Sequence, residues 1–182
     1  MALRLFRTTG YSTLLMPGEA RLARHPAQLV LGASLWIALA CNVALWRLLG
    51  GAAEQLVPAV VAAAILGGGS GLAFSLLGWR RTLKPAITFT LIAASLVAAG
   101  LWSQQLPIDT LWQGPPRTLL PAWTSFMRWD VLGIVLVLAV VPIVWLWNHG
   151  IRRMPGPKQL QSSITGALLG AIVLGCGIFL LR

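Results

Sequence analysis

Five long apolar stretches occupy most of this 182-residue chain. Each is close to the ~20 residues that a helix needs to cross a hydrocarbon layer about 30 Å thick. Lipid offers no hydrogen-bond partners, so the backbone groups of such stretches must be bonded within the segment, which favours helices. Strands of a barrel would be about ten residues long and would alternate in polarity, and these stretches do neither. The stretches cover residues 27–49, 56–77, 85–102, 131–147 and 162–181.

Composition excludes a water-soluble domain. Hydrophobic residues make up 57% of the chain and charged residues only 10%, whereas a soluble domain carries about 25% charged residues. The sequence therefore predicts an all-α integral membrane protein. It consists of a basic cytoplasmic tail, residues 1–26, and a membrane domain of five transmembrane helices, residues 27–182.

The net charge of +10 does not indicate a nucleic-acid partner, because the basic residues do not gather on one face. They form short groups between alternate apolar stretches, as the positive-inside rule describes for cytoplasmic loops. This pattern predicts an N-terminus inside and a C-terminus outside. The inner groups are Arg4, Arg7, Arg21 and Arg24, then Arg80, Arg81 and Lys84, then Arg152, Arg153 and Lys158.

The predicted outer side carries the other four basic residues and three of the four acids: Arg47, Arg117, Arg128, Arg182, Glu54, Asp109 and Asp130. Tryptophan favours the membrane–water boundary. Two belts are therefore expected, with Trp46, Trp102, Trp112, Trp123 and Trp129 outside and Trp79, Trp145 and Trp147 inside. The outer loop 103–129, rich in Pro and Trp, is predicted to form short interfacial helices.

The sequence offers no catalytic metal site. Its ligand-type residues are two histidines, two cysteines and four acids. No three of them share a side of the membrane at a short spacing, as a zinc site requires. Cys41 and Cys176 lie inside apolar stretches and are interpreted as small hydrophobic residues.

Small residues predict where helices pack closely. Gly67 and Gly71 belong to a glycine-rich run in the second stretch, and Gly166 and Gly170 have small-xxx-small spacing in the fifth. Asn42 is the one notable polar residue inside the first stretch, where an amide bonds a neighbouring helix or, less simply, a ligand. Pro142 predicts a kink in the fourth stretch.

Several short motifs resemble one membrane-enzyme family. His25-Pro26 with the run 38–46, the turn 81–85, and the run 141–147 followed by Ile151-Arg152-Arg153 resemble parts of the membrane domain of the lipid A phosphoethanolamine transferases. The helix number, the orientation and the long second outer loop are also similar. The resemblance spans about residues 25–182.

This resemblance implies a bacterial inner-membrane location and a role in lipopolysaccharide modification. Family members move phosphoethanolamine from phosphatidylethanolamine to lipid A, with a zinc-bound threonine in a periplasmic domain after the fifth helix. The chain ends at Arg182, so it is expected to contain neither that zinc site nor that nucleophile. It would then be a lipid-site scaffold or anchor, either a natural truncated form or a fragment cut before that domain.

The outer loop departs from the family pattern, since only Ile108-Asp109 matches it. The lipid head-group candidates are Arg117, Asp109 and Gln113. A guanidinium can bind two phosphate oxygens at once, although the simpler reading of Arg117 is a solvated residue at the loop tip. Phosphatidylethanolamine or lipid A, and a membrane or periplasmic protein, are the partners considered beside the bilayer.

Two other functions stay open at this point. The chain could be a helix-packing subunit of a membrane complex unrelated to lipid A, with its glycine-rich faces as docking surfaces. A small transporter is disfavoured, because no ionisable residue lies at mid-depth and no internal repeat is visible.

Overall fold

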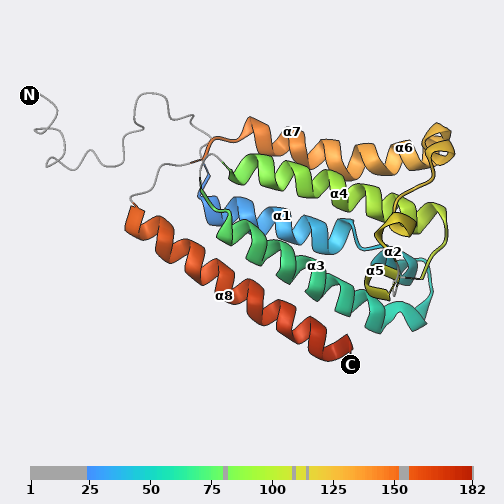
Figure 1. The fold of residues 1–182 in the computed structure, drawn as a ribbon, viewed down its shortest axis with the longest axis horizontal. Coiled ribbons are helices and arrows are strands. Elements are labelled where there is room, and N and C mark those ends of the chain that lie inside the picture. Colours follow the sequence, from blue (N-terminus) through green and yellow to red (C-terminus); the bar gives the residue numbers. More distant parts are fainter. Residues whose placement is uncertain (1–23, 80–81, 108–109, 114, 152–155, 182) are drawn as a thin grey trace, which may run out of the picture.

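The computed structural model describes residues 24–79, 82–107, 110–113, 115–151 and 156–181, and within them every element longer than an isolated bridge is helical (Figure 1). The α-helices of about two turns or more are α1 (Pro26–Ala40), α2 (Val43–Leu49), α3 (Leu56–Leu76), α4 (Leu83–Ser103), α6 (Trp129–Val135), α7 (Val141–Asn148) and α8 (Gly156–Leu181). The short elements are η3 (Ala53–Gln55), α5 (Thr110–Gln113), η4 (Pro116–Leu119), η5 (Trp123–Met127) and the π-helix η6 (Leu136–Val140).

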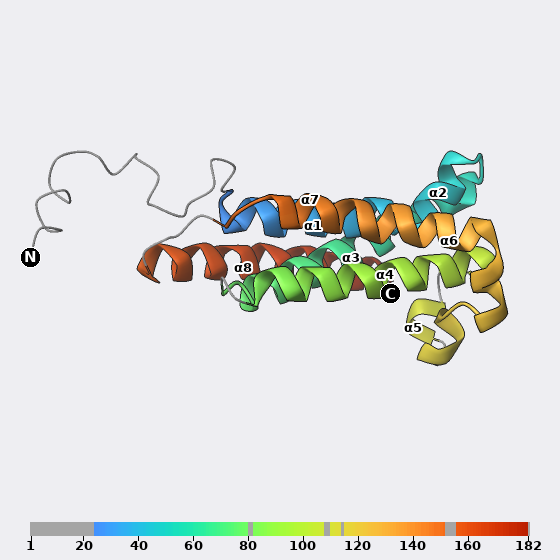
Figure 2. The same cartoon turned by 90° about the horizontal axis from the view of Figure 1, so that it is seen from above.

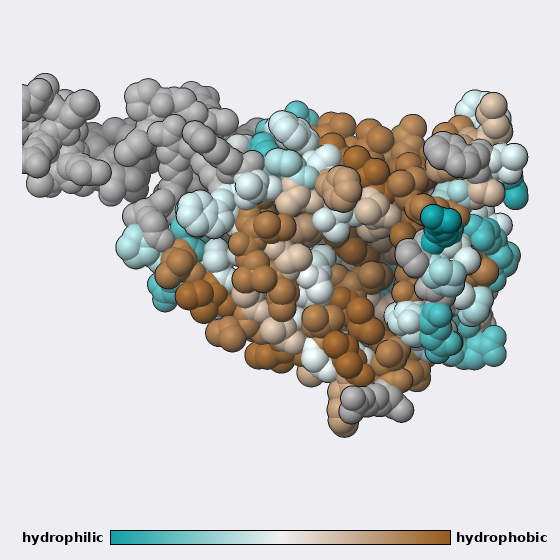
Figure 3. Space-filling model, in the orientation of Figure 1, coloured by the Kyte–Doolittle hydropathy of each residue, from teal (hydrophilic) through white to brown (hydrophobic). Residues whose placement is uncertain are grey.

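Four continuous helical stretches are long and apolar enough to cross a membrane: Ala53–Leu76, Leu83–Ser103, Trp129–Asn148 and Pro157–Leu181. The bent pair of α1 and α2 makes a fifth if it is taken as one span. Apolar side chains cover the middle of the visible face, and polar ones gather toward its ends (Figure 3). The chain is a multi-pass membrane protein, and five spans agree with the predicted number only when the bent pair counts as one.

In Figure 1 the helices follow one another in the order α8, α3, α1, α4 and α7, and each contacts the next. Figure 2 shows α1 and α7 on one side of the bundle and α4 and α8 on the other. Helices α1, α4 and α8 begin at one end of the bundle, which we call the basic end because Arg24, Lys84 and Lys158 lie there. The other end carries α2, α5, η4 and η5, and we call it the loop end. The main core cluster joins α1, α3 and α4 through residues such as Leu29, Phe74 and Leu91.

The first span is broken, whereas the sequence predicted one continuous helix over 27–49. Asn42 is fully buried, and its side-chain oxygen accepts a hydrogen bond from Leu45 N at 3.3 Å. This bond caps a new helix, α2, which bends by 55° from α1. The amide nitrogen of Asn42 donates to the Ala59 carbonyl on α3 at 2.8 Å. The same side chain therefore starts α2 and bonds a neighbouring helix.

Proline reshapes the fourth span. Pro142 lies at the start of α7, just after the π-helix η6. Without an N–H, Pro142 cannot bond the Leu138 carbonyl four residues earlier. The indole nitrogen of Trp36 on α1 donates to that carbonyl at 3.1 Å. Where the sequence predicted a kink, the structure has a π-helical turn, and the bond to Leu138 ties η6 to α1.

Helices α3 and α8 approach closely through glycine. A Cβ at Gly68 would collide with the Leu174 backbone nitrogen, and one at Gly170 would come within 2.6 Å of Leu72 N. A Cβ at Gly166 would meet the Ser75 hydroxyl at 2.5 Å. We call this contact the glycine seam. Gly68 was not singled out from the sequence, although it makes the tightest contact on α3.

The other two glycines named from the sequence face α1 instead. A Cβ at Gly67 would lie 3.0 Å from Ala38 Cβ, and one at Gly71 would lie 3.5 Å from the Ser34 hydroxyl. Helix α3 therefore uses neighbouring glycines against two different helices. This division follows from the helical repeat, which turns consecutive residues onto different faces.

The glycine seam makes a paired prediction. Gly68→Ala should lower the free energy of unfolding by about 1–3 kcal/mol, because the added methyl group meets backbone that cannot move aside. Gly69→Ala should be neutral or stabilising by up to about 1 kcal/mol, since its nearest neighbour is the Leu174 side chain at 3.9 Å. Unfolding in mixed detergent and SDS micelles, followed by circular dichroism, measures both. Equal effects of the two variants would contradict the glycine seam.

Candidate functional site

The loop end is organised around the end of α4. The last carbonyls of a helix lack intrahelical partners and carry partial negative charge. Arg47 of α2 donates to the carbonyls of Leu106 at 2.8 Å and Leu101 at 3.2 Å. Its guanidinium therefore caps α4. Because these carbonyls already occupy it, we do not count Arg47 among the candidates for binding an anionic ligand.

The outer loop folds onto the same helix. The Leu119 carbonyl contacts Gly100 at the place where a Cβ would project. The side-chain amide of Gln104 donates to the Leu120 carbonyl at 2.9 Å. Leu119 is buried and belongs to a second core cluster with Cys41 and Leu101. The segment around η4 therefore covers the end of α4, and only glycine at position 100 permits so close an approach.

A cavity of about 490 Å³ lies beside this cover, between the helices α1, α2, α4 and α6. Three tryptophans of the predicted outer belt line it: Trp46 of α2, Trp102 of α4 and Trp129 of α6. The indole of Trp46 is held by a bond of 2.9 Å to the Ala40 carbonyl, freed where α1 ends. The break at Asn42 thus also positions one wall of the cavity.

One acidic residue lines this cavity, and a basic residue outside the lining pairs with it. Asp130 lines it and pairs with Arg128 at 3.3 Å. The two side chains are 70% and 62% exposed, respectively, and an exposed pair of this kind contributes little to stability because water screens it. Both groups can therefore exchange partners at low cost. Aromatic faces attract cations, carboxylates accept from ammonium groups, and a guanidinium binds phosphate in a fork.

The predicted head-group residues lie on the neighbouring loop segments. Gln113 ends α5, Arg117 lies in η4, and both side chains are exposed. Neither has a side-chain hydrogen bond or an ion pair within the described part of the chain. Helices α5 and η4 contact each other, so the two residues share one region. Asp109 lies outside the described residues.

Sequence reasoning missed Arg128 and Asp130 as a pair. Both were placed outside the membrane, but their spacing of two residues was not connected with the tryptophans. The signal was present, because Arg128-Trp129-Asp130 puts both charges beside a belt tryptophan. Among the residues that the structure describes, no group of three His, Cys, Asp or Glu could hold a metal ion.

Comparison with known protein families agrees with this membrane architecture. The model of the N-terminal domain of the family "Phosphoethanolamine transferase EptA/EptB" matches residues 69–182. This chain belongs to the EptA/EptB family. The match includes the turn 81–85 and the run 141–153, on which the resemblance partly rested, and it begins after the motifs at 25–26 and 38–46.

No curated protein and no solved structure matches the chain significantly. The matched region includes α4, the outer loop, α6, α7 and α8. It also includes Arg117, Arg128 and Asp130, so the loop-end site lies mostly within the part of the chain that defines the family.

Proposed function

We propose that this EptA/EptB-family membrane domain holds a phosphatidylethanolamine molecule at its loop end, as a lipid-site scaffold. The observation that carries the proposal is the exposed Arg128–Asp130 pair at a cavity walled by tryptophans. A phosphatidylethanolamine head group has one ammonium and one phosphate. The ammonium meets Asp130 and the indole faces, and the phosphate meets Arg128.

The apolar lining of the cavity supports a lipid over a soluble ligand. Ala98, Ile134 and Val137 belong to this lining, and we call them the apolar floor. Tryptophan side chains favour the head-group level of a membrane. An acyl chain can therefore lie along the apolar floor while the head group stays at the charged mouth.

Selectivity between two phospholipids tests the site. Asp130→Asn keeps the size of the side chain and removes the partner of the ammonium. We expect retention of phosphatidylethanolamine to fall about three- to tenfold, while retention of phosphatidylglycerol stays unchanged. Native mass spectrometry of the purified protein measures both lipids.

Glu54→Gln is the matched control, since Glu54 is an exposed acid in η3 that does not line the cavity. It should leave both lipids unaffected. If Asp130→Asn retains phosphatidylethanolamine as well as the unchanged protein does, the cavity does not select an ammonium head group.

We also propose Arg117 as a second phosphate contact, with Gln113 and Asp109 in the same region. Arg117→Ala should weaken phospholipid retention several-fold without loss of helical content, and Arg117→Lys should restore it only in part, because an ammonium cannot form the two-pronged bond. The same mass measurement applies. Equal retention by all three proteins would leave η4 as a structural cover over α4.

The proposal requires the loop end to face the periplasm of a bacterial inner membrane. The basic end carries Arg24, Lys84 and Lys158, and the sequence adds further arginines to the segments on that side. The positive-inside rule then places the basic end in the cytoplasm. A phosphatase fused after Arg182 should be active, and one fused after Arg81 should be silent. The reverse pattern would turn the site toward the cytoplasm and end the proposal.

No observation favours the alternative of a helix-docking subunit. Its docking surfaces were to be the glycine-rich faces of the second and fifth spans. In the structure these faces meet each other at the glycine seam, where Gly68 and Gly170 are both buried. Family membership also connects the chain with phosphoethanolamine transfer.

A further inference from the structure

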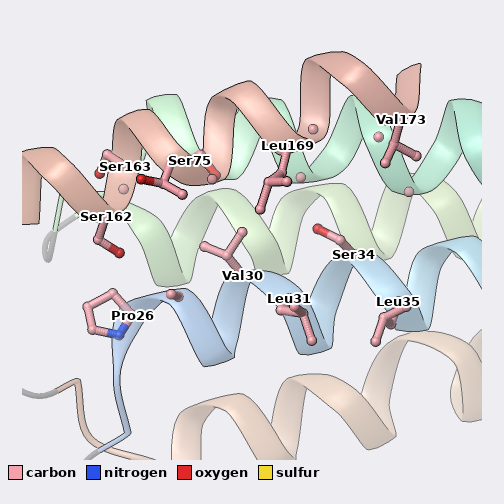
Figure 4. Close-up of a pocket in the computed structure, with 18 of the residues that line it drawn as sticks. Pro26, Val30, Leu31, Ser34, Leu35, Ser75, Ser162, Ser163, Leu169 and Val173 are labelled. Carbon is pink, nitrogen blue, oxygen red and sulfur yellow. The ribbon is translucent and has the colours of Figure 1, made fainter. Parts of the chain in front are cut away.

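A second and larger cavity lies on the other side of the bundle. It is a groove of about 870 Å³ between α1, α3 and α8, and Figure 4 shows its walls. Its rim carries leucines that are half exposed or more, among them Leu31 at 62% and Leu169 at 60%. The groove therefore opens sideways at the depth where the apolar stretches meet lipid.

The length of the groove suits an acyl chain. Along α1 its lining runs from Pro26 to Leu39, and along α8 from Lys158 to Val173. At 1.5 Å per residue, these walls are about 20 Å long. One leaflet of hydrocarbon is about 15 Å thick, half of a ~30 Å core. A lipid chain of ordinary length fits along the groove.

Polar residues gather at the basic end of the groove. His25, Lys158, Gln161 and Ser162 line it there, where α1 and α8 both begin. The Nδ1 of His25 accepts a bond from Ala27 N at 3.2 Å, which leaves the Nε2 of the neutral ring as a donor. Two helix N-termini add positive potential. The mouth of the groove is therefore a place for an anion.

The charge at the groove differs from that at the loop end. Lys158 is the charged residue among the described residues that line it, and none of them is acidic. An ammonium head group would find no carboxylate there. A phosphodiester with net negative charge would find Lys158 and the His25 donor.

The chain alone leaves this groove incompletely packed. Ser34 of α1 points into it (Figure 4), is 9% exposed, and its hydroxyl has no hydrogen-bond partner in the described residues. A buried hydroxyl without a partner costs about 1–3 kcal/mol. At the loop end, by contrast, the side chains of Arg47, Trp46 and Gln104 all donate hydrogen bonds to backbone carbonyls.

We propose that this groove binds one anionic phospholipid from the leaflet at the basic end. Its phosphate lies at Lys158 and His25, and one acyl chain follows α1 and α8 past Ser34. A second copy of the chain is a poorer occupant. Two copies in one membrane share an orientation, so their basic ends would meet and repel. The proposal does not depend on the loop-end site.

Lipid binding to variants at the basic end tests the groove. Delipidated protein in detergent is titrated with phosphatidylglycerol, and bound lipid is counted by native mass spectrometry. Lys158→Gln should weaken binding about tenfold, because a charge-assisted bond to phosphate is lost. Lys84→Gln is the matched control: Lys84 lies at the same end, above the Trp147 ring, and does not line the groove. It should bind as the unchanged protein does.

A second variant tests the chain-binding part. Gly71 lines the groove, and a Cβ there would stand 3.5 Å from the Ser34 hydroxyl. Gly71→Leu should therefore obstruct the groove and abolish binding of one phosphatidylglycerol. Circular dichroism shows whether the variant keeps its helices. Inorganic phosphate in excess should not displace the lipid, since the acyl chain supplies much of the affinity.

Three results would overturn the proposal. Lys158→Gln and Lys84→Gln could weaken binding equally, which would indicate unspecific attraction to the basic end. Inorganic phosphate could compete fully, which would reduce the site to an anion site. A dimer mass that Gly71→Leu removes would make the groove an interface between two copies. The result for Asp130→Asn at the loop end does not affect any of these three tests of the groove.

Discussion

Backbone N–H and C=O groups in an apolar environment need hydrogen-bond partners. The shape of this domain depends on the side chains that supply those bonds where a helix breaks or ends. Lipid cannot supply the hydrogen bonds that water gives a loop. At the break after α1, Trp46 bonds the Ala40 carbonyl. At the π-helical turn, Trp36 bonds the Leu138 carbonyl that Pro142 leaves free. At the end of α4, Arg47 bonds two carbonyls. Each of these bonds also joins two separate elements. The bonds that satisfy the irregular backbone therefore also hold in place the helices around the loop-end cavity.

The glycine seam sets the second feature. Because Gly68 and Gly170 let α3 and α8 touch along their backbones, α8 packs on α3 and makes few contacts with α1. Helix α8 thereby leaves the groove beside α1 open. A larger residue at either glycine would move α8 away from α3 and change the groove with it. The packing of α8 on α3 and the open groove beside α1 both result from the close approach of α3 and α8 at the glycine seam.

Much of the architecture could be predicted from the sequence, and the reasons for the rest are physical. Long apolar stretches give the helices, but not their neighbours, since α8 packs on α3 and lies far from α7, the helix that precedes it in the chain. The break at Asn42 escaped prediction because hydropathy averages over a window and does not register one side chain that caps a helix. The cavity residues escaped for another reason. Trp46, Trp102 and Trp129 come from three helices, and only tertiary packing brings them to one cavity beside Asp130. The roles of Arg117 and Gln113 stay predictions, since their exposed side chains contact no described partner.

The two cavities lie toward opposite ends of the bundle and differ in the charges beside them. The loop-end cavity is lined by Asp130, which pairs with Arg128, and the pair complements a zwitterion. The groove has Lys158 and no acid, so it complements an anion. The two cavities share no lining residue among those that the structure describes. A lipid in the groove would brace α8 against α1 without touching the loop end. Under the two proposals, a lipid in the groove would hold α8 in position, and the loop end would hold a phosphoethanolamine head group.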